Sequence, residues 1–205
     1  VSMMPINDGY PFTGGSSSYL TATSRTGNFG GGLGFTLSAW VYRTRSGSAW
    51  DRLIDFGNGP SSENIIVAFQ HNMWFGVRYG QAWTTYSVAA RPFPVNQWVH
   101  VGVMVSRASM SDLTGLSAIY WDGVQVASHS SMRFPLSVAR SNHYVGKSNW
   151  GSDPMFSGKM KDLLIWDVAL STSELDNVRL GGSLPTSTAP LVSMMSICRQ
   201  YSLTT

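Results

Sequence analysis

Apolar and polar residues alternate with a period of two along much of the chain, in short runs separated by glycine, serine and asparagine. Between residues 35 and 42, phenylalanine, leucine, alanine and valine alternate with threonine, serine, tryptophan and tyrosine. Between residues 98 and 105, valine occupies every second position from residue 99. Such alternation predicts strands with one buried face, and a buried face needs a second sheet to cover it. We therefore predict an all-β fold, a two-sheet antiparallel β-sandwich.

The runs that fit this pattern predict strands at 11–12, 19–23, 35–43, 53–56, 65–70, 73–79, 84–88, 98–105, 117–121, 124–128, 143–146 and 159–167. Asp122-Gly123 separates two of them and predicts a two-residue hairpin turn, because both residue types accept a positive φ. One short C-terminal α-helix is predicted at 171–180. Ser171 and Glu174 have the spacing of a capping box there, and two glycines follow the helix as a stop signal.

The chain divides into one domain and a tail. At 205 residues it has the size of a single β-sandwich, which we assign to residues 1–182. Residues 183–205 form a tail that contains serine, threonine and proline, yet the stretch 191–197 is too apolar for an ordinary solvated terminus. We predict that this stretch docks as an added strand, either on its own sandwich or on a neighbouring molecule. The second arrangement would produce a homo-oligomer.

Composition and charge exclude several classes of protein. Charged residues make up 12% of the chain and hydrophobic residues 43%, which excludes a disordered chain. The apolar stretches reach only about five residues, so we expect no membrane insertion. The net charge is +3, and the arginines are scattered from Arg25 to Arg199, which argues against a nucleic-acid partner. Cys198 is the single cysteine, so no intrachain disulfide can form.

Five segments follow one another in an order and spacing that resemble a known family. They are residues 10–20, Phe35-Thr36-Leu37-Ser38-Ala39-Trp40-Val41, Asn96-Gln97-Trp98-Val99-His100-Val101, Ile119-Tyr120-Trp121-Asp122-Gly123-Val124-Gln125-Val126, and residues 156–171 leading into Glu174-Leu175. Together they resemble the laminin-G-like and pentraxin-like jelly rolls of the concanavalin A-like lectin/glucanase superfamily. The resemblance implies a jelly roll and an extracellular or cell-surface location. It implies much less about activity, because one fold hosts many functions.

The sequence departs from the pentraxin-like pattern at two features. Pentraxins tie two strands together with a disulfide whose positions correspond here to Ser38 and Gly102, so that bridge is absent. Their paired calcium ions are held by an Asp-Asn pair and by an acid-rich loop. These correspond here to Ser62-Glu63 and to residues 148–150, which carry few carboxylates. A site for two calcium ions is therefore not expected.

Two interpretations of this region remain open. Calcium takes about six to eight oxygen ligands, several of them from carboxylates. One weakly bound calcium ion could use Glu63, Asn64, Asn149 or Asp153 together with backbone carbonyls. Alternatively, the same residues satisfy turns through side-chain hydrogen bonds to the backbone.

The carboxylates argue against an enzyme. Glucan-cleaving members of the superfamily resemble one another in carrying two glutamates a few residues apart on one strand, whereas Glu63 and Glu174 are far apart here. Asp51 and Asp55 are four residues apart around a strand and could share a face, or instead contact Arg52 or solvent. The four histidines show no metal-binding spacing. We therefore expect no hydrolase.

Aromatic side chains are what the sequence offers a ligand. Tryptophan and tyrosine in or near loops and hairpin ends can stack on sugar faces, while asparagine, glutamine and arginine donate hydrogen bonds. The loop and hairpin aromatics are Trp50, Trp74, Trp83, Tyr86 and Trp150. The candidate glycan-binding residues are Trp50, Trp83, Tyr86, Asn149 and Trp150. We expect Trp40, Trp98, Trp121 and Trp166 in the core.

Two functions from different classes follow. The first is a non-catalytic, lectin-like module of a larger extracellular or surface protein, with a glycan as its partner. The alternative is a structural or adhesion module that packs against neighbouring protein domains or copies of itself and binds no sugar.

Overall fold

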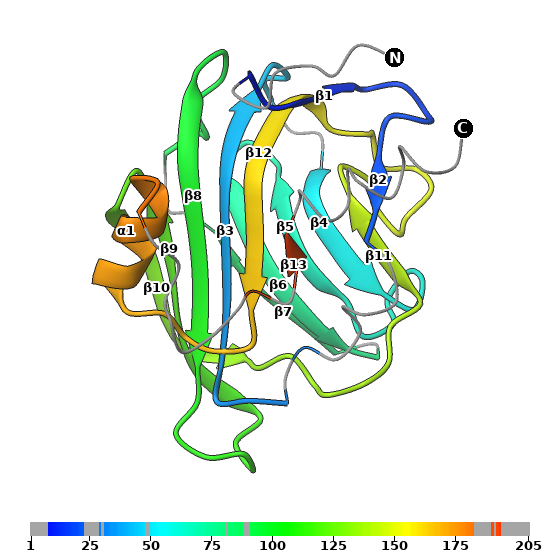
Figure 1. Cartoon of the computed structure of the whole chain (residues 1–205). Helices are drawn as coiled ribbons and strands as arrows, with labels where there is room; N and C mark the ends of the chain where they lie inside the picture. The colour runs from blue at the N-terminus through cyan, green and yellow to red at the C-terminus, as the bar shows by residue number, and fades with distance from the viewer. Residues whose placement is uncertain are drawn as a thin grey trace.

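The protein is a sandwich of two antiparallel sheets (Figure 1). The computed structural model describes residues 8–22, 29, 31–47, 50–80, 82–87, 91–182, 190 and 192–193, of which 82–87 and 192–193 are described by their backbone. The seven-stranded sheet runs in the order β1 (Tyr10–Thr13), β12 (Ser157–Trp166), β3 (Gly34–Arg43), β8 (Trp98–Ser106), β9 (Thr114–Trp121) and β10 (Val124–Arg133), with β13 (Val192–Ser193) also paired to β12. The six-stranded sheet runs in the order β2 (Leu20–Thr21), β11 (Asn142–Val145), β4 (Asp51–Gly57), β5 (Ile65–Phe69), β6 (Met73–Tyr79) and β7 (Ala82–Ser87). The predicted all-β sandwich is confirmed.

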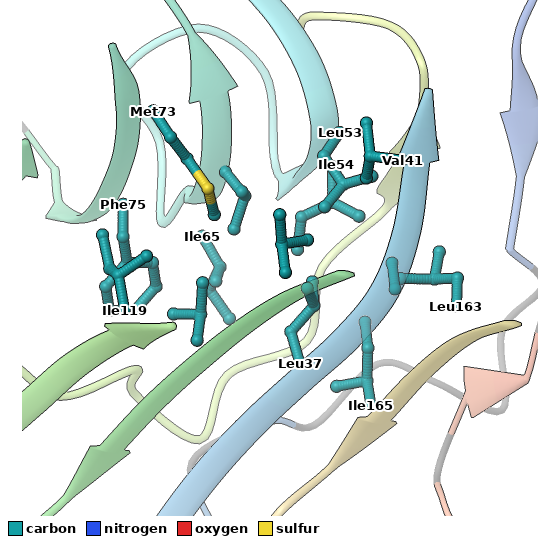
Figure 2. Close-up of a cluster of buried hydrophobic side chains, with 14 of the residues drawn as sticks. Leu37, Val41, Leu53, Ile54, Ile65, Met73, Phe75, Ile119, Leu163 and Ile165 are labelled. Carbon is teal, nitrogen blue, oxygen red and sulfur yellow. The ribbon is translucent and has the colours of Figure 1, made fainter. Parts of the chain in front are cut away.

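The hydrophobic core lies between the two sheets (Figure 2). Leu37 and Val41 of β3 and Ile165 of β12 come from the seven-stranded sheet, and Ile65 and Phe75 come from β5 and β6 of the other. All five side chains are fully buried. They occupy the apolar positions of the period-two alternation, so hydrophobic burial sets which face of each strand turns inward.

Two of the four tryptophans expected in the core are half-buried on the outer face of the seven-stranded sheet instead. Trp121 and Trp166 are buried as expected, but Trp40 and Trp98 alternate with core valines and face outward. The ring of Trp98 lies edge-on to Tyr42, 5.6 Å between centroids, and the Lys161 ammonium is 5.0 Å from the Trp98 centroid. The strand alternation therefore outweighs the general tendency of tryptophan to be buried, because a ring can cover the sheet while its edge reaches water.

Helix α1 (Thr172–Arg179) packs on the outer side of the seven-stranded sheet (Figure 1). Ser171 is its N-cap, and both hydrogen bonds of the predicted capping box to Glu174 are present. Ser38 and Gly102 lie directly opposite each other on β3 and β8. A Cβ at Gly102 would stand 2.5 Å from Leu175 Cδ2 of the helix. Where the resemblance implies a pentraxin disulfide, this chain has a glycine against which the helix packs.

The tail contacts its own sandwich. Ser193 pairs with Leu164 and Val192 pairs with Ile165. Strand β13 therefore pairs with β12, as β1 does, at one edge of the seven-stranded sheet. These two residues therefore dock on the chain's own sandwich, which is one of the two predicted arrangements. Residues 191 and 194–197 of the predicted strand lie outside the described residues.

His100 is buried beneath the helix, on the outer face of β8. It is 1% exposed, its Nε2 lies 2.9 Å from the Ser38 hydroxyl, and its ring is edge-on to Trp40 at 5.3 Å. Burial lowers the pKa of His100 to about 4; the positive charge of Arg179 acts in the same direction, and Asp176 opposes it. His100 is therefore a structural histidine that stays neutral at neutral pH.

The fold should lose stability in mild acid because of His100. The unfolded chain takes up this proton near the ordinary pKa of 6.5, whereas the folded chain does so only near pH 4. The contribution of this pKa difference to the free energy of unfolding is complete above the unfolded pKa and is lost as the pH falls from 6.5 toward 4. Between pH 7 and 4.5, we expect wild type to lose about 2–3 kcal/mol more unfolding free energy than His100→Gln, measured with urea. Equal losses in the two proteins would contradict this origin.

Candidate functional site

A β-bulge in β4 creates the centre of the site. The pairing of β4 with β5 shifts between Arg52 and Ile54, so Leu53 and Ile54 both enter the core. As a result Arg52 and Asp55 both lie on the outer face of the six-stranded sheet, although residues three apart on a regular strand face opposite sides. Asp51, before the bulge, points inward and pairs with Arg43 at 2.6 Å. Of the two alternatives for this pair, a face shared by Asp51 and Asp55 is wrong because of the bulge, whereas the alternative contact with Arg52 is observed for Asp55.

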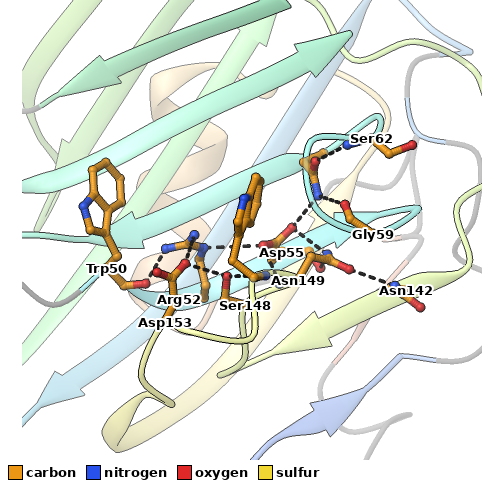
Figure 3. A network of polar contacts seen from close by, with 11 residues as sticks. Trp50, Arg52, Asp55, Gly59, Ser62, Asn142, Ser148, Asn149 and Asp153 are labelled. Atoms are coloured by element: carbon orange, nitrogen blue, oxygen red, sulfur yellow. Dashed lines mark hydrogen bonds and ion pairs between the residues drawn. The ribbon is translucent and has the colours of Figure 1, made fainter. Parts of the chain in front are cut away.

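Asp55 is a buried carboxylate held by amide groups (Figure 3). The Asn149 backbone N–H donates to Asp55 Oδ2 at 2.9 Å and its side-chain Nδ2 donates to Oδ1 at 2.8 Å. Asn64 Nδ2 donates to Oδ1 at 3.0 Å. Burial raises the pKa of Asp55, while these hydrogen bonds and the nearby Arg52 act in the opposite direction. Asp55 therefore joins the loop that carries Asn64 to the loop that carries Asn149.

Arg52 fastens the loop of residues 146–156, between β11 and β12, onto β4 (Figure 3). Its Nη2 donates to Asp153 Oδ2 at 2.7 Å, its Nη1 donates to the Trp50 carbonyl, and its Nε lies 3.5 Å from Asp55 Oδ2. The Ser148 hydroxyl also donates to Asp153 Oδ2, at 2.8 Å. The same hydroxyl accepts from the backbone N–H of residue 150 at 3.0 Å. These contacts fix the backbone of the loop over the sheet.

Three half-buried tryptophans lie near one another here: Trp50 and Trp150 contact Arg52, and Trp74 contacts Trp50. We call Trp50, Trp74 and Trp150 together the tryptophan surface. The Trp50 and Trp74 rings lie 5.2 Å apart at a 48° tilt. The Arg52 guanidinium is 5.7 Å from the ring centroids of both Trp50 and Trp150. The Arg78 guanidinium of β6 is 5.8 Å from the Trp150 centroid. Since β5 lies between β4 and β6, the Trp150 ring extends across the outer face of the six-stranded sheet.

The backbone of Trp50 supports this placement. Its φ is +55°, in the left-handed region that large side chains rarely adopt. Such strain costs on the order of 1–3 kcal/mol and persists where surrounding contacts hold it, often at functional positions. Here the carbonyl of Trp50 accepts from Arg52 and its ring packs against Trp74, so both neighbours hold the residue in this conformation.

The structure brings together part of the set predicted from sequence. Trp50, Asn149 and Trp150 converge, together with Trp74, which is one of the loop and hairpin aromatics named above. The register places Trp83 opposite Arg78 and Tyr86 opposite Phe75, and the side chains of β7 lie outside the described part of the structure. Sequence reasoning did not include Arg52 and Arg78 in the site. The alternation along β6 could have indicated Arg78, because it shares an outward register with Trp74.

The residues suggested as calcium ligands do not fit a calcium ion as they are arranged. Asn64 and Asn149 turn their amide nitrogens toward Asp55, and Asp153 is already paired with Arg52. Glu63 Oε1 accepts from the Gly80 backbone at 3.2 Å, beside the turn between β6 and β7. Among the described residues, no three or more of the histidine, cysteine, aspartate and glutamate side chains gather where they could hold a metal ion.

The two glutamates are engaged in different places. Glu63 lies beside the six-stranded sheet, whereas Glu174 Oε2 accepts from the Ser171 backbone at 2.7 Å, on the outer side of the other sheet. Hydrogen bonds from the backbone and hydroxyl of Ser171 lower the pKa of Glu174. The pair needed for retaining glycoside hydrolysis stands about 5 Å apart on one site. Glu63 and Glu174 do not form such a pair.

Three solved structures show the same fold as this chain. The first is domain 4 of AbnA, a GH43 extracellular arabinanase from Geobacillus stearothermophilus, in complex with arabinotriose: TM-score 0.62, 18% identity, covering 82% of this chain and 74% of that one. The second is a heptameric SAP-like pentraxin from Limulus polyphemus: TM-score 0.59, 16% identity, covering 93% and 94%. The third is the CBM40 of Ruminococcus gnavus IT-sialidase bound to α2,3-sialyllactose: TM-score 0.58, 14% identity, covering 83% and 95%.

The sequence itself matches one family. A comparison with curated proteins found no significant match. Across the described residues, no helix is both long and apolar enough to cross a membrane. Residues 13–176 match the family model described as the concanavalin A-like lectin/glucanases superfamily. Because this match spans most of the chain and the observed sandwich agrees with it, the chain belongs to the concanavalin A-like lectin/glucanases superfamily.

Proposed function

We propose that the chain is a non-catalytic, lectin-like module that binds glycans at the tryptophan surface, as one part of a larger extracellular or surface protein. The observation that carries the proposal is the clustering of three tryptophans on one sheet face: Trp50 and Trp150 contact Arg52, and Trp74 contacts Trp50. Indole faces stack on the C–H faces of sugar rings, and neighbouring arginine and amide groups can bond sugar hydroxyls. The surface combines both kinds of group.

The fixed loop strengthens this proposal. A binding surface gains affinity when its groups are held in place before the ligand arrives, because less conformational freedom is lost on binding. The contacts of Asp153 and Asn149 hold the 146–156 loop, and therefore the backbone of Trp150, in the free protein. Proteins of the same fold bind oligosaccharides, as the arabinotriose and sialyllactose complexes show for those proteins. The engagement of Glu63 and Glu174 elsewhere supports binding without hydrolysis.

A glycan array followed by titration of its strongest ligand tests the proposal. Trp150→Ala is expected to weaken the affinity for that ligand about tenfold or more, equivalent to about 1.4 kcal/mol, because a stacking face is removed. Trp74→Ala should act in the same direction.

Trp98→Ala is the matched control, because Trp98 is also half-buried but lies on the outer face of the opposite sheet. We expect its dissociation constant to stay within about twofold of wild type. If Trp98→Ala lost as much affinity as Trp150→Ala, the glycan would not bind specifically at the tryptophan surface. An array without any ligand, together with concentration-dependent elution, would favour the alternative of a protein-assembly module.

A further inference from the structure

The guanidinium of Arg52 lies among oxygen atoms from two segments, residues 50–55 and the 146–156 loop. Asp153 Oδ2 is 2.7 Å from its Nη2 and Asp55 Oδ2 is 3.5 Å from its Nε, while the Trp50 carbonyl accepts from its Nη1. Carboxylate and carbonyl oxygens are the ligands that calcium takes in proteins. We infer that Arg52 takes the place of a bound cation, so that the tryptophan surface is held in position without a divalent metal ion.

The asparagines agree with this inference. An asparagine binds a metal through its side-chain oxygen. Here Asn64 Oδ1 accepts from the Ser62 backbone at 2.9 Å, and Asn149 Oδ1 accepts from Asn142 Nδ2 at 2.8 Å. Their nitrogens point at Asp55 instead. Both amide oxygens are therefore used within the chain, and the charge that Asp55 and Asp153 require comes from Arg52.

The guanidinium of Arg52 also contacts aromatic rings in this position. It is planar and lies 5.7 Å from each of the Trp50 and Trp150 ring centroids, so one group neutralises carboxylates and contacts two aromatic faces. The Arg52 side chain is 4% exposed, Asp55 is 0% exposed and Asp153 is 20% exposed. An entering divalent cation would have to displace a buried positive charge, and repulsion between the two cations opposes this.

The wild-type protein gives the direct test by thermal melting with calcium chloride and with EDTA. A native-state site with calcium in hundredfold excess over its dissociation constant would raise the melting temperature by about 5–10 °C. We expect the melting temperature to change by less than about 1 °C with either reagent, which is well below the rise that such a site would cause. A rise of several degrees with calcium, or a fall with EDTA, would overturn the inference.

Arg52→Ser provides the second test, because it removes the built-in cation and leaves two carboxylates together. We expect a lower melting temperature that millimolar calcium partly restores. Arg43→Ser is the matched control: Arg43 is also buried and paired with an aspartate, at 2.6 Å, but with Asp51 alone. Calcium should not restore the melting temperature of Arg43→Ser. It should also not restore that of the double variant Arg52→Ser with Asp153→Asn. Failure of calcium to restore Arg52→Ser more than Arg43→Ser would count against a cation position at Arg52.

The inference rests on the proposed function only in that the loop held by Arg52 carries Trp150 of the tryptophan surface. Its test does not need a glycan. If Arg52→Ser fails to fold, the wild-type calcium and EDTA melts still decide. Absence of a glycan ligand with metal-insensitive melting would reject the proposed function and keep the inference. A glycan ligand whose binding is lost in EDTA would keep the function and reject the inference.

Discussion

Replacing Asp51 by asparagine is expected to lower the free energy of unfolding by about 3–5 kcal/mol, because it leaves the buried charge of Arg43 without a counterion. Arg43 and Asp51 are 1% and 0% exposed, and two bonds join them, Nη2 to Oδ1 at 2.6 Å and Nε to Oδ2 at 3.0 Å. The pair lies where β3 and β4 face each other across the core, with the guanidinium 5.4 Å from the Phe69 centroid. Urea unfolding at neutral pH measures the loss.

The matched control removes both charges. Arg43→Met with Asp51→Leu replaces the pair by apolar side chains, and we expect this double variant to be more stable than Asp51→Asn by about 2 kcal/mol or more. The comparison isolates the unpaired charge from the loss of packing. A double variant less stable than the single one would show that the pair contributes more than mutual neutralisation.

Phe75→Ala should destabilise the sandwich by a similar amount, about 3–5 kcal/mol, because it opens a cavity in the core. Phe75 is 0% exposed, and its ring stacks on Phe35 of the opposite sheet with centroids 6.4 Å apart and planes 5° apart. It therefore joins the two sheets. Chemical denaturation of the variant measures the loss.

Leu116→Ala serves as the control for truncating a large apolar side chain, because Leu116 is 63% exposed on β9. We expect its unfolding free energy to change by about 0.5 kcal/mol or less. A loss for Phe75→Ala as small as for Leu116→Ala would mean that the core does not depend on the contact between Phe75 and Phe35.

Local patterns were sufficient to predict most of the fold. The alternation along β3 and β8, the capping box of Ser171 and Glu174, and the positive φ of Asp122-Gly123 each depend on neighbouring residues. Apolar side chains that repeat every second residue must share a face, so the sandwich follows from the sequence alone. The expectation that Trp40 and Trp98 lie in the core was wrong; the strand alternation is the better guide, because it assigns them to the outer face, where the structure shows them half-buried.

The candidate site was predicted only in part. Trp50, Asn149 and Trp150 could be named from loops and hairpin ends, and the structure brings them together. The bulge that turns Arg52 and Asp55 to one side could not be predicted, because a run of apolar residues does not show where an extra residue enters. The pairing with β5 decides that position.

The sequence by itself determined which strands form, which face of each is apolar, where the helix begins, and that these 205 residues form no intrachain disulfide. Only the tertiary structure decided that Arg52 neutralises Asp153, 101 residues further along the chain, and that Asn149 holds Asp55, 94 residues earlier. The physical reason is the separation along the sequence over which each interaction acts. Strand alternation and helix capping act between near neighbours, whereas an ion pair or a buried hydrogen bond depends on which distant segments the folded sheets bring within a few ångströms of each other.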